Sequence, residues 1–310
     1  MYTVTFHKMI KSHLFSTSKS SFKPYSKVNN FVTKVNYQYN CQNSLIRKFS
    51  DISKTKTENN LEEYFDPARY DFEYGHYKKD FNLFLNLKTS DSTVLDLACG
   101  TGRLSIPLQK KGFKVTGLDI SSHMLEYAKS KSNQLPINYI QGDIRNFQLN
   151  KKFDLIIMAG NSFQALLTKE EQCTMFKSVQ AHLKQKGLFA FNTRAFIYEK
   201  VKSTNDFEYW HEFYDQRSNN LVKVFGKQSY DPKYRIVTYT TKRVEIDKEK
   251  KTKTKLLFTP YIELIDQIKS CGFEISEVYG NVDKTPYSDS SPAIIPICHL
   301  GDCLEQTIHD

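Results

Sequence analysis

The 310-residue sequence predicts an α/β fold with a doubly wound parallel sheet, and three observations support this. First, short β-type runs alternate with helix-like segments; the runs lie at 94–97, 113–119, 137–140, 153–158 and 188–191. Second, the connections are short, and right-handed crossovers of this kind join parallel strands. Third, the first run ends in Asp96 and a tight glycine turn that leads into a helix-like segment.

The stretch 93–120 carries the most information about a ligand. The turn Cys99-Gly100-Thr101-Gly102 allows the backbone to bend sharply and to approach a ligand without an intervening side chain. Asp119 ends the second strand, where an acid can accept hydrogen bonds from both hydroxyls of a ribose. A dinucleotide site would have a third glycine where Ser105 stands, and Asp96 would repel a pyrophosphate but attract the ammonium group of an amino acid. An ordinary strand–turn–helix junction and a dinucleotide site are the alternatives.

The spacing of DLACGTG at 96–102 closely resembles motif I of the class I S-adenosylmethionine (SAM)-dependent methyltransferases, with Ala98 in place of the first glycine. The resemblance covers about residues 64–299. Within the family, the sequence is similar to a bacterial-type small-molecule methyltransferase subgroup. It implies a Rossmann-like, doubly wound seven-stranded sheet with an antiparallel edge strand. It also implies SAM as cofactor and a small-molecule methyl acceptor, whose identity and acceptor atom stay open.

The resemblance further implies where each part of SAM binds. Asp96 would hold the amino group of the methionine portion, and the backbone near Gly100 would line its chain. Asp119 would bind the ribose, Asp143 the adenine amino group, and Asn161 would lie beside the methyl group. A Tyr-rich N-terminal segment would fold over the donor. The implied cofactor-binding set is Asp96, Ala98, Gly100, Gly102, Asp119, Ile120, Asp143, Ile144, Asn161 and Tyr74.

The acceptor side is less defined, because methyl transfer depends mainly on holding donor and acceptor in line. A general base is needed only where the acceptor must lose a proton. The catalytic candidates are His211, Asn161 and Arg194, and no spacing of residues predicts a metal site.

After the fifth predicted strand, at 188–191, strand-like segments no longer alternate with helix-like segments. Residues 207–247 predict an antiparallel β-meander inserted there, and the charged run 247–255 predicts a solvated loop. A helix is expected after Pro260, followed by strands at 273–278 and 293–298 that form the antiparallel edge.

The net charge of +10 resides in the N-terminal segment. Residues 1–50 hold eight of the 44 basic residues and no acid, which leaves 36 basic against 34 acidic residues in the remainder. A basic, acid-free, Ser-rich leader with an amphipathic start predicts a disordered mitochondrial-type transit peptide at 1–50 and a matrix location. The protein would be cytoplasmic if this leader is not a transit peptide. We expect a linker at 51–60 and the methyltransferase domain at 61–310.

Two other functions remain open. One is a protein or RNA methyltransferase, although the near-neutral remainder of the chain offers no basic groove and no nucleic-acid partner is expected. The other is a catalytically inactive SAM-fold assembly or interaction factor in mitochondria. No run of about 18 apolar residues predicts a membrane span. Oligomeric state is not indicated.

Overall fold

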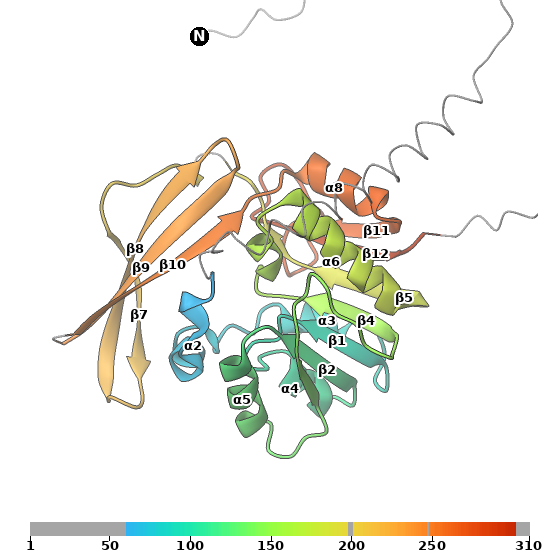
Figure 1. Cartoon of the computed structure of the whole chain (residues 1–310), viewed down its shortest axis with the longest axis horizontal. Coiled ribbons are helices and arrows are strands. Elements are labelled where there is room, and N and C mark those ends of the chain that lie inside the picture. The colour runs from blue at the N-terminus through green and yellow to red at the C-terminus, as the bar shows by residue number, and fades with distance from the viewer. Residues whose placement is uncertain (1–59, 198–200, 247, 302–310) are drawn as a thin grey trace, which may run out of the picture. The chain divides into compact units, whose positions relative to one another are not determined.

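The computed structural model describes residues 60–197, 201–246 and 248–301 (Figure 1). The predicted transit peptide at 1–50 and all of the predicted linker except Asn60 lie outside these residues.

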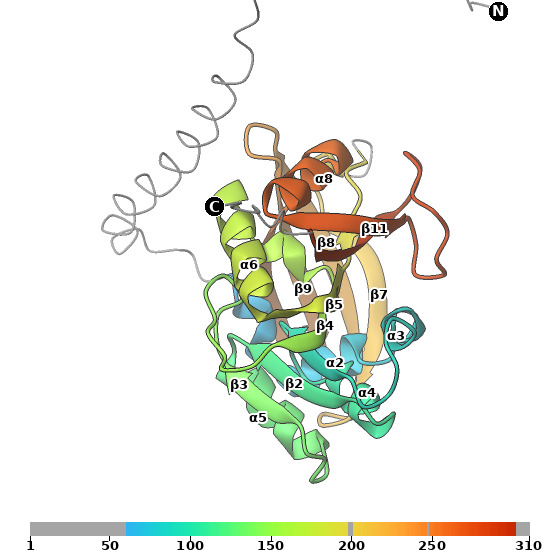
Figure 2. The same cartoon turned by 90° about the vertical axis from the view of Figure 1, so that its right-hand side faces the viewer.

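Seven strands of the described residues form the main sheet in the order β11-β12-β5-β4-β1-β2-β3; Figure 1 labels the strands from β11 to β2, and Figure 2 labels β3. Strands β1 to β5 pair in parallel, whereas β12 runs antiparallel to both β5 and β11. The short β6 (Thr193–Arg194) pairs with β12. The Rossmann-like sheet with an antiparallel edge is therefore confirmed. The bounds are β1 Thr93–Leu97, β2 Lys114–Asp119, β3 Asn138–Gln141, β4 Phe153–Met158, β5 Leu183–Phe191, β11 Phe273–Tyr279 and β12 Ala293–Leu300.

Helices bury both faces of this sheet because successive strand residues point to opposite sides. Leu95 and Ile156 pack with helices α6 and α8, and Val94 and Leu155 pack with α3 and α4. The bounds are α2 Pro67–Tyr74, α3 Phe81–Leu85, α4 Ser105–Lys110, α5 Ser122–Lys131, α6 Lys169–His182 and α8 Tyr261–Ser270, with short 3₁₀ turns η1 Glu62–Tyr64 and η2 Ser162–Ala165. None of these helices is long and apolar enough to cross a membrane.

A second, four-stranded antiparallel sheet follows β6 in the chain, in the order β10-β9-β8-β7 (Figure 1). We call it the inserted sheet; its strands are β7 Glu208–Asp215, β8 Asn220–Asp231, β9 Ile236–Glu245 and β10 Lys248–Leu257. Helix α2 packs against β7 and against α5, and so lies between the inserted sheet and the main sheet.

The predicted solvated loop at 247–255 is wrong, since Lys248–Leu257 form β10 and pair with β9 along their whole length. The inserted sheet therefore extends ten residues beyond the predicted bound of 247. Its alternating Lys and Thr residues have the period of a strand with one solvated face. Thr252 is buried and its lysine neighbours on either side are exposed. The high charge of the run led to the loop prediction in spite of this strand-like alternation.

Candidate functional site

The loop after β1 adopts left-handed backbone conformations that glycine accommodates without strain. The φ angles are 54° at Ala98, 53° at Gly100 and 78° at Gly102. A Cβ atom on Gly102 would lie 2.7 Å from the hydroxyl oxygen of Tyr139, so the protein's own packing requires glycine there. A Cβ atom on Gly100 would meet nothing within 4 Å. The protein therefore leaves open space beside Gly100, as a ligand-binding loop requires.

Asp96 forms the floor of a pocket beside this loop. Its carboxylate is buried and accepts a 2.6 Å hydrogen bond from the Ser105 hydroxyl. Burial raises the pKa of Asp96 to about 7, and the Ser105 hydrogen bond opposes that shift. The pocket is lined by Tyr70, Asp96, Ala98, Cys99, Gly100, Thr101, Arg103, Leu104, Ala159, Gly160 and Ser162. Ser105 stands where a dinucleotide site has its third glycine. Its hydroxyl thus holds Asp96, an acid that a dinucleotide site lacks.

Asp119 links the ends of β1 and β2. Its two carboxylate oxygens accept hydrogen bonds from the backbone N–H groups of Gly100 and Ser121, each at 2.8 Å. Burial raises the pKa of Asp119, and these backbone donors oppose the shift. Each oxygen has a further lone pair, so ribose hydroxyls can still donate to it. The neighbouring Ile120 is exposed.

Asp143 and Ile144 follow β3, as the sequence predicts. The Asp143 carboxylate accepts three hydrogen bonds from the Arg145 guanidinium at 2.6–3.0 Å. Burial would raise the pKa of Asp143, but the contact with Arg145 lowers it overall. Ile144 packs against the core beside α6. Arg145, which sequence reasoning missed, therefore fixes the orientation of the predicted adenine-binding acid.

Asn161 follows β4 with a left-handed φ of 60°. Its side-chain oxygen accepts a 2.8 Å hydrogen bond from the amide of Asn192, which follows β5. Its neighbours Gly160 and Ser162 line the pocket, but Asn161 does not. Asn161 thus joins the ends of two strands beside the pocket.

Helix α2 covers the pocket and is attached to the glycine loop. Asp71 accepts hydrogen bonds from the Thr101 hydroxyl and from the Lys131 ammonium group on α5. Tyr70 lines the pocket, whereas the ring of Tyr74 lies 5.0 Å beyond that of Tyr70. The N-terminal cover therefore contributes Tyr70 to the pocket lining, and the predicted Tyr74 packs against Tyr70.

The catalytic candidates Arg194 and His211 contact different partners. The Arg194 guanidinium carbon is 6.0 Å from the ring centre of Tyr239 on β9, and no carboxylate of the described residues forms an ion pair with it. His211, on β7, places Nε2 3.2 Å from Oε1 of Glu73 on α2.

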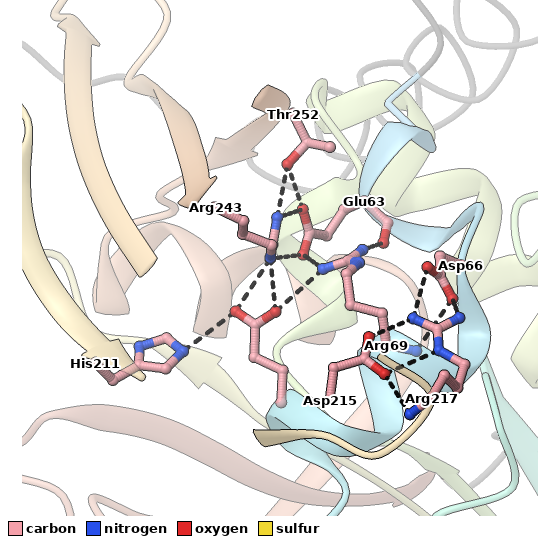
Figure 3. Close-up of polar contacts among 9 residues, drawn as sticks. Glu63, Asp66, Arg69, His211, Asp215, Arg217, Arg243 and Thr252 are labelled. Carbon is pink, nitrogen blue, oxygen red and sulfur yellow. Dashed lines mark hydrogen bonds and ion pairs between the residues drawn. The ribbon is translucent and has the colours of Figure 1, made fainter. Parts of the chain in front are cut away.

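A buried ion-pair cluster ties the N-terminal cover to the inserted sheet (Figure 3). The Arg243 guanidinium on β9 contacts the carboxylates of Glu63 and Glu73, with Nε 2.7 Å from Glu73 Oε2. Arg69 contacts the same two carboxylates at 3.1 Å, and the Thr252 hydroxyl donates to Glu63 at 2.6 Å. These five residues form the buried ion cluster. The sequence gives no signal for it, because Glu63 and Arg243 are 180 residues apart.

The fold is a Rossmann-like α/β fold, and its glycine loop and strand-end acids lie together at one edge of the main sheet. A family model described as a methyltransferase domain matches residues 94–187. The putative methyltransferase YqeM of Bacillus subtilis is 30% identical over 214 residues, which cover 64% of this chain and 80% of that relative. The chain belongs to this family, the bacterial-type class I SAM-dependent methyltransferases.

Two further similarities are informative. A SAM-dependent methyltransferase from Clostridium acetobutylicum has the same fold, with a TM-score of 0.61, 20% identity and coverage of 84% of this chain and all of that one. The dTDP-3-amino-3,4,6-trideoxy-alpha-D-glucopyranose N,N-dimethyltransferase of Streptomyces venezuelae is 33% identical over 97 residues, or 31% of this chain and 40% of that relative. SAM is the cofactor of this family, and the open space beside Gly100, next to two acids, fits it.

Proposed function

We propose that this enzyme transfers the methyl group of SAM to a small molecule. The observation that carries the proposal is the pocket between Asp96 and Tyr70, covered by α2, which the buried ion cluster joins to the inserted sheet. Because α2 covers the pocket, it limits the size of the acceptor that can reach SAM there. The name of the S. venezuelae relative gives a sugar nucleotide as its substrate, which supports a small-molecule acceptor for this enzyme. The near-neutral charge of residues 51–310 disfavours RNA.

Each part of SAM has a proposed partner. Asp96 holds the ammonium group of the methionine portion and Asp119 the ribose hydroxyls, while Asp143 and Ile144 contact the adenine. When bound, SAM supplies a methyl group on a positively charged sulfur, which loses its charge on transfer. The protein's contribution is to orient donor and acceptor, worth up to roughly 7–11 kcal/mol in favourable cases.

The raised pKa of Asp96 makes SAM binding depend on pH near neutrality. Only the ionised carboxylate attracts an ammonium group, so affinity should fall as the pH falls through 7. Between pH 7.0 and 6.0 the ionised fraction drops from about one half to about one tenth, and affinity should fall about fivefold. Titration calorimetry at the two pH values measures this. Asp96→Asn should bind more weakly with no such dependence, and equal wild-type affinities at both values contradict the role.

The proposed function is tested by donor binding and methyl transfer in one set of variants. Asp119→Ala should weaken SAM binding about 100-fold, since two charge-assisted hydrogen bonds of roughly 1.5 kcal/mol each are lost. The matched control is Asp154→Ala, because Asp154 lies at the opposite end of the sheet and pairs with Lys184. Unchanged binding in Asp119→Ala contradicts the site.

The acceptor class is tested with methyl-labelled SAM and an extract of the source cells. Label is expected in the small-molecule fraction when wild-type enzyme is added. Label confined to protein or to RNA would replace this proposal with the corresponding alternative. Failure to label any fraction, with SAM bound, would favour the inactive assembly factor.

We further propose that residues 1–50 direct the protein to the mitochondrial matrix. Eight basic residues without an acid support this, since import signals are basic and acid-poor. A fluorescent protein carrying residues 1–60 should enter mitochondria, and a matched leader in which the eight basic residues of 1–50 are changed to glutamine should not. A diffuse cytosolic signal from the unchanged leader rejects the proposal.

A further inference from the structure

A β-bulge in the inserted sheet sets the direction of His211. The pairing of β7 with β8 shifts between Tyr209 and His211, so that Trp210 is an extra residue in β7. His211 therefore lies opposite Val224, which is fully buried and itself lies opposite Arg243. Without the bulge, His211 would share the outer face of Tyr209. Bulges of this kind often redirect a side chain beside an active site.

Gly226 gives the bulge its room. A Cβ atom at Gly226 would lie 1.9 Å from the Trp210 ring, so the indole packs directly on the glycine backbone. The Trp210 ring also contacts Tyr239 on β9. The bulge thus turns Trp210 and His211 together toward the face of the inserted sheet that carries the buried ion cluster.

The buried ion cluster fixes the tautomer of His211. Nε2 is 3.2 Å from Oε1 of Glu73, a carboxylate that also accepts hydrogen bonds from Arg69 and Arg243. A carboxylate only accepts, so Nε2 carries the proton and Nδ1 keeps its lone pair. Two arginines already balance Glu63 and Glu73, so the cluster is neutral with His211 uncharged. A proton on Nδ1 would add a positive charge facing Glu73 and Tyr74 of α2 and Arg243 of β9.

Nδ1 of His211 has no hydrogen-bond partner among the described residues. The side chain is 38% exposed, so a ligand can reach it. The ring of Tyr74 lies 6.2 Å from His211 and 5.0 Å from Tyr70, which lines the donor pocket. Tyr74 and Tyr70 therefore connect the imidazole to the lining of the donor pocket through successive ring contacts.

We propose that His211 is the general base of the reaction, positioned by Glu73, and that the acceptor is a hydroxyl or a protonated amine. The inference rests on the proposed small-molecule function. The acceptor's proton moves to Nδ1 of His211, before attack for a protonated amine and during attack for a hydroxyl. The heteroatom's lone pair forms the bond to the methyl carbon as the carbon–sulfur bond breaks, and the electrons of the broken bond stay on sulfur. The imidazolium beside Glu73 later releases its proton to water. A positioned base of this kind contributes about 10²–10⁴-fold.

The first test reads the tautomer directly by ¹⁵N NMR of the histidine rings in the full chain at neutral pH. His211 should show a protonated Nε2 and an unprotonated Nδ1, with the signals assigned from their loss in His211→Gln. A protonated Nδ1 overturns the proposal without any knowledge of the acceptor.

The second test measures methyl transfer to the small-molecule fraction across pH. His211→Gln should lower the rate about 100-fold at pH 7 and leave SAM affinity within twofold. At saturating SAM, which removes the contribution of Asp96 to the pH dependence, the wild-type rate should fall toward acid pH and His211→Gln should lose that dependence; added imidazole should partly rescue His211→Ala. A merely structural role would not alter the pH profile.

The matched control is His299→Gln, since His299 also lies near a carboxylate, with Nε2 4.0 Å from Glu274, but on β12 of the main sheet. Its rate and pH profile should match the wild type. A His211→Gln enzyme with the wild-type pH profile overturns the proposal. If the wild type binds SAM but labels no small molecule, the proposed function is contradicted. The NMR experiment then still tests the tautomer of His211, because it needs no acceptor.

Discussion

Replacing Gly100 by leucine is expected to weaken SAM binding at least 100-fold while the protein still folds. The left-handed backbone at Gly100, with φ of 53°, costs an L-residue roughly 1–2 kcal/mol, which a folded domain tolerates. A Cβ atom there meets no protein atom within 4 Å, so the new side chain enters open space in the donor pocket. Titration calorimetry measures the loss of affinity, and circular dichroism reports the fold.

The matched control for this substitution is Gly112→Leu. Gly112 also has a left-handed backbone, with φ of 93°, but it lies between α4 and β2, and its Cβ would sit 3.4 Å from Ser90. This variant should lose a similar amount of stability and bind SAM as the wild type does. Near-normal binding by Gly100→Leu would show that the space beside Gly100 is not the donor site.

Replacing Arg243 by methionine should lower the free energy of unfolding by about 3–5 kcal/mol. Arg243 is 4% exposed and contacts both carboxylates of the buried ion cluster, so its loss leaves Glu63 and Glu73 with Arg69 as their one remaining arginine. The arginine lowers the pKa of Glu63 against the opposing effect of burial. Urea unfolding measures the change.

An exposed arginine supplies the control for this prediction. Arg235→Met removes a two-point contact with Glu263 at 2.6 and 2.7 Å, but both side chains are exposed, and the expected loss is below about 1 kcal/mol. Adding Glu73→Gln to Arg243→Met should recover part of the lost stability, because one stranded charge is removed. Equal effects of Arg243→Met and Arg235→Met would contradict the importance of the buried cluster.

Local pattern and short-range chemistry explain what could be predicted from the sequence. The strands of the main sheet follow from alternating apolar runs, and the loop follows from two glycines within three residues. Ser121 caps the N-terminus of α5, where its hydroxyl accepts a 3.3 Å hydrogen bond from the Met124 backbone N–H. The acids at the C-terminal ends of β1, β2 and β3 all lie at the same edge of the sheet, since parallel strands end together.

The features that could not be predicted depend on contacts between distant parts of the chain. Asp71 meets Thr101 and Lys131, and His211 meets Glu73 from 138 residues away, so no sequence window contains both partners. The direction of His211 depends on a one-residue bulge, which reverses the face that simple alternation assigns. Strand β10 was missed for a different reason. Its many lysines are typical of a solvated loop, although their alternation with threonines has the period of a strand.

The long separation between Glu63 and Arg243 also fixes the order in which the enzyme can be assembled during synthesis. At roughly 5–20 residues per second, a ribosome needs about 10–40 s to make the intervening 180 residues. During that time the glycine loop and strands β1 to β4 emerge and can fold, whereas the glutamates of η1 and α2 await Arg243. The floor of the pocket can thus form first, and its N-terminal cover, although translated earlier, closes last.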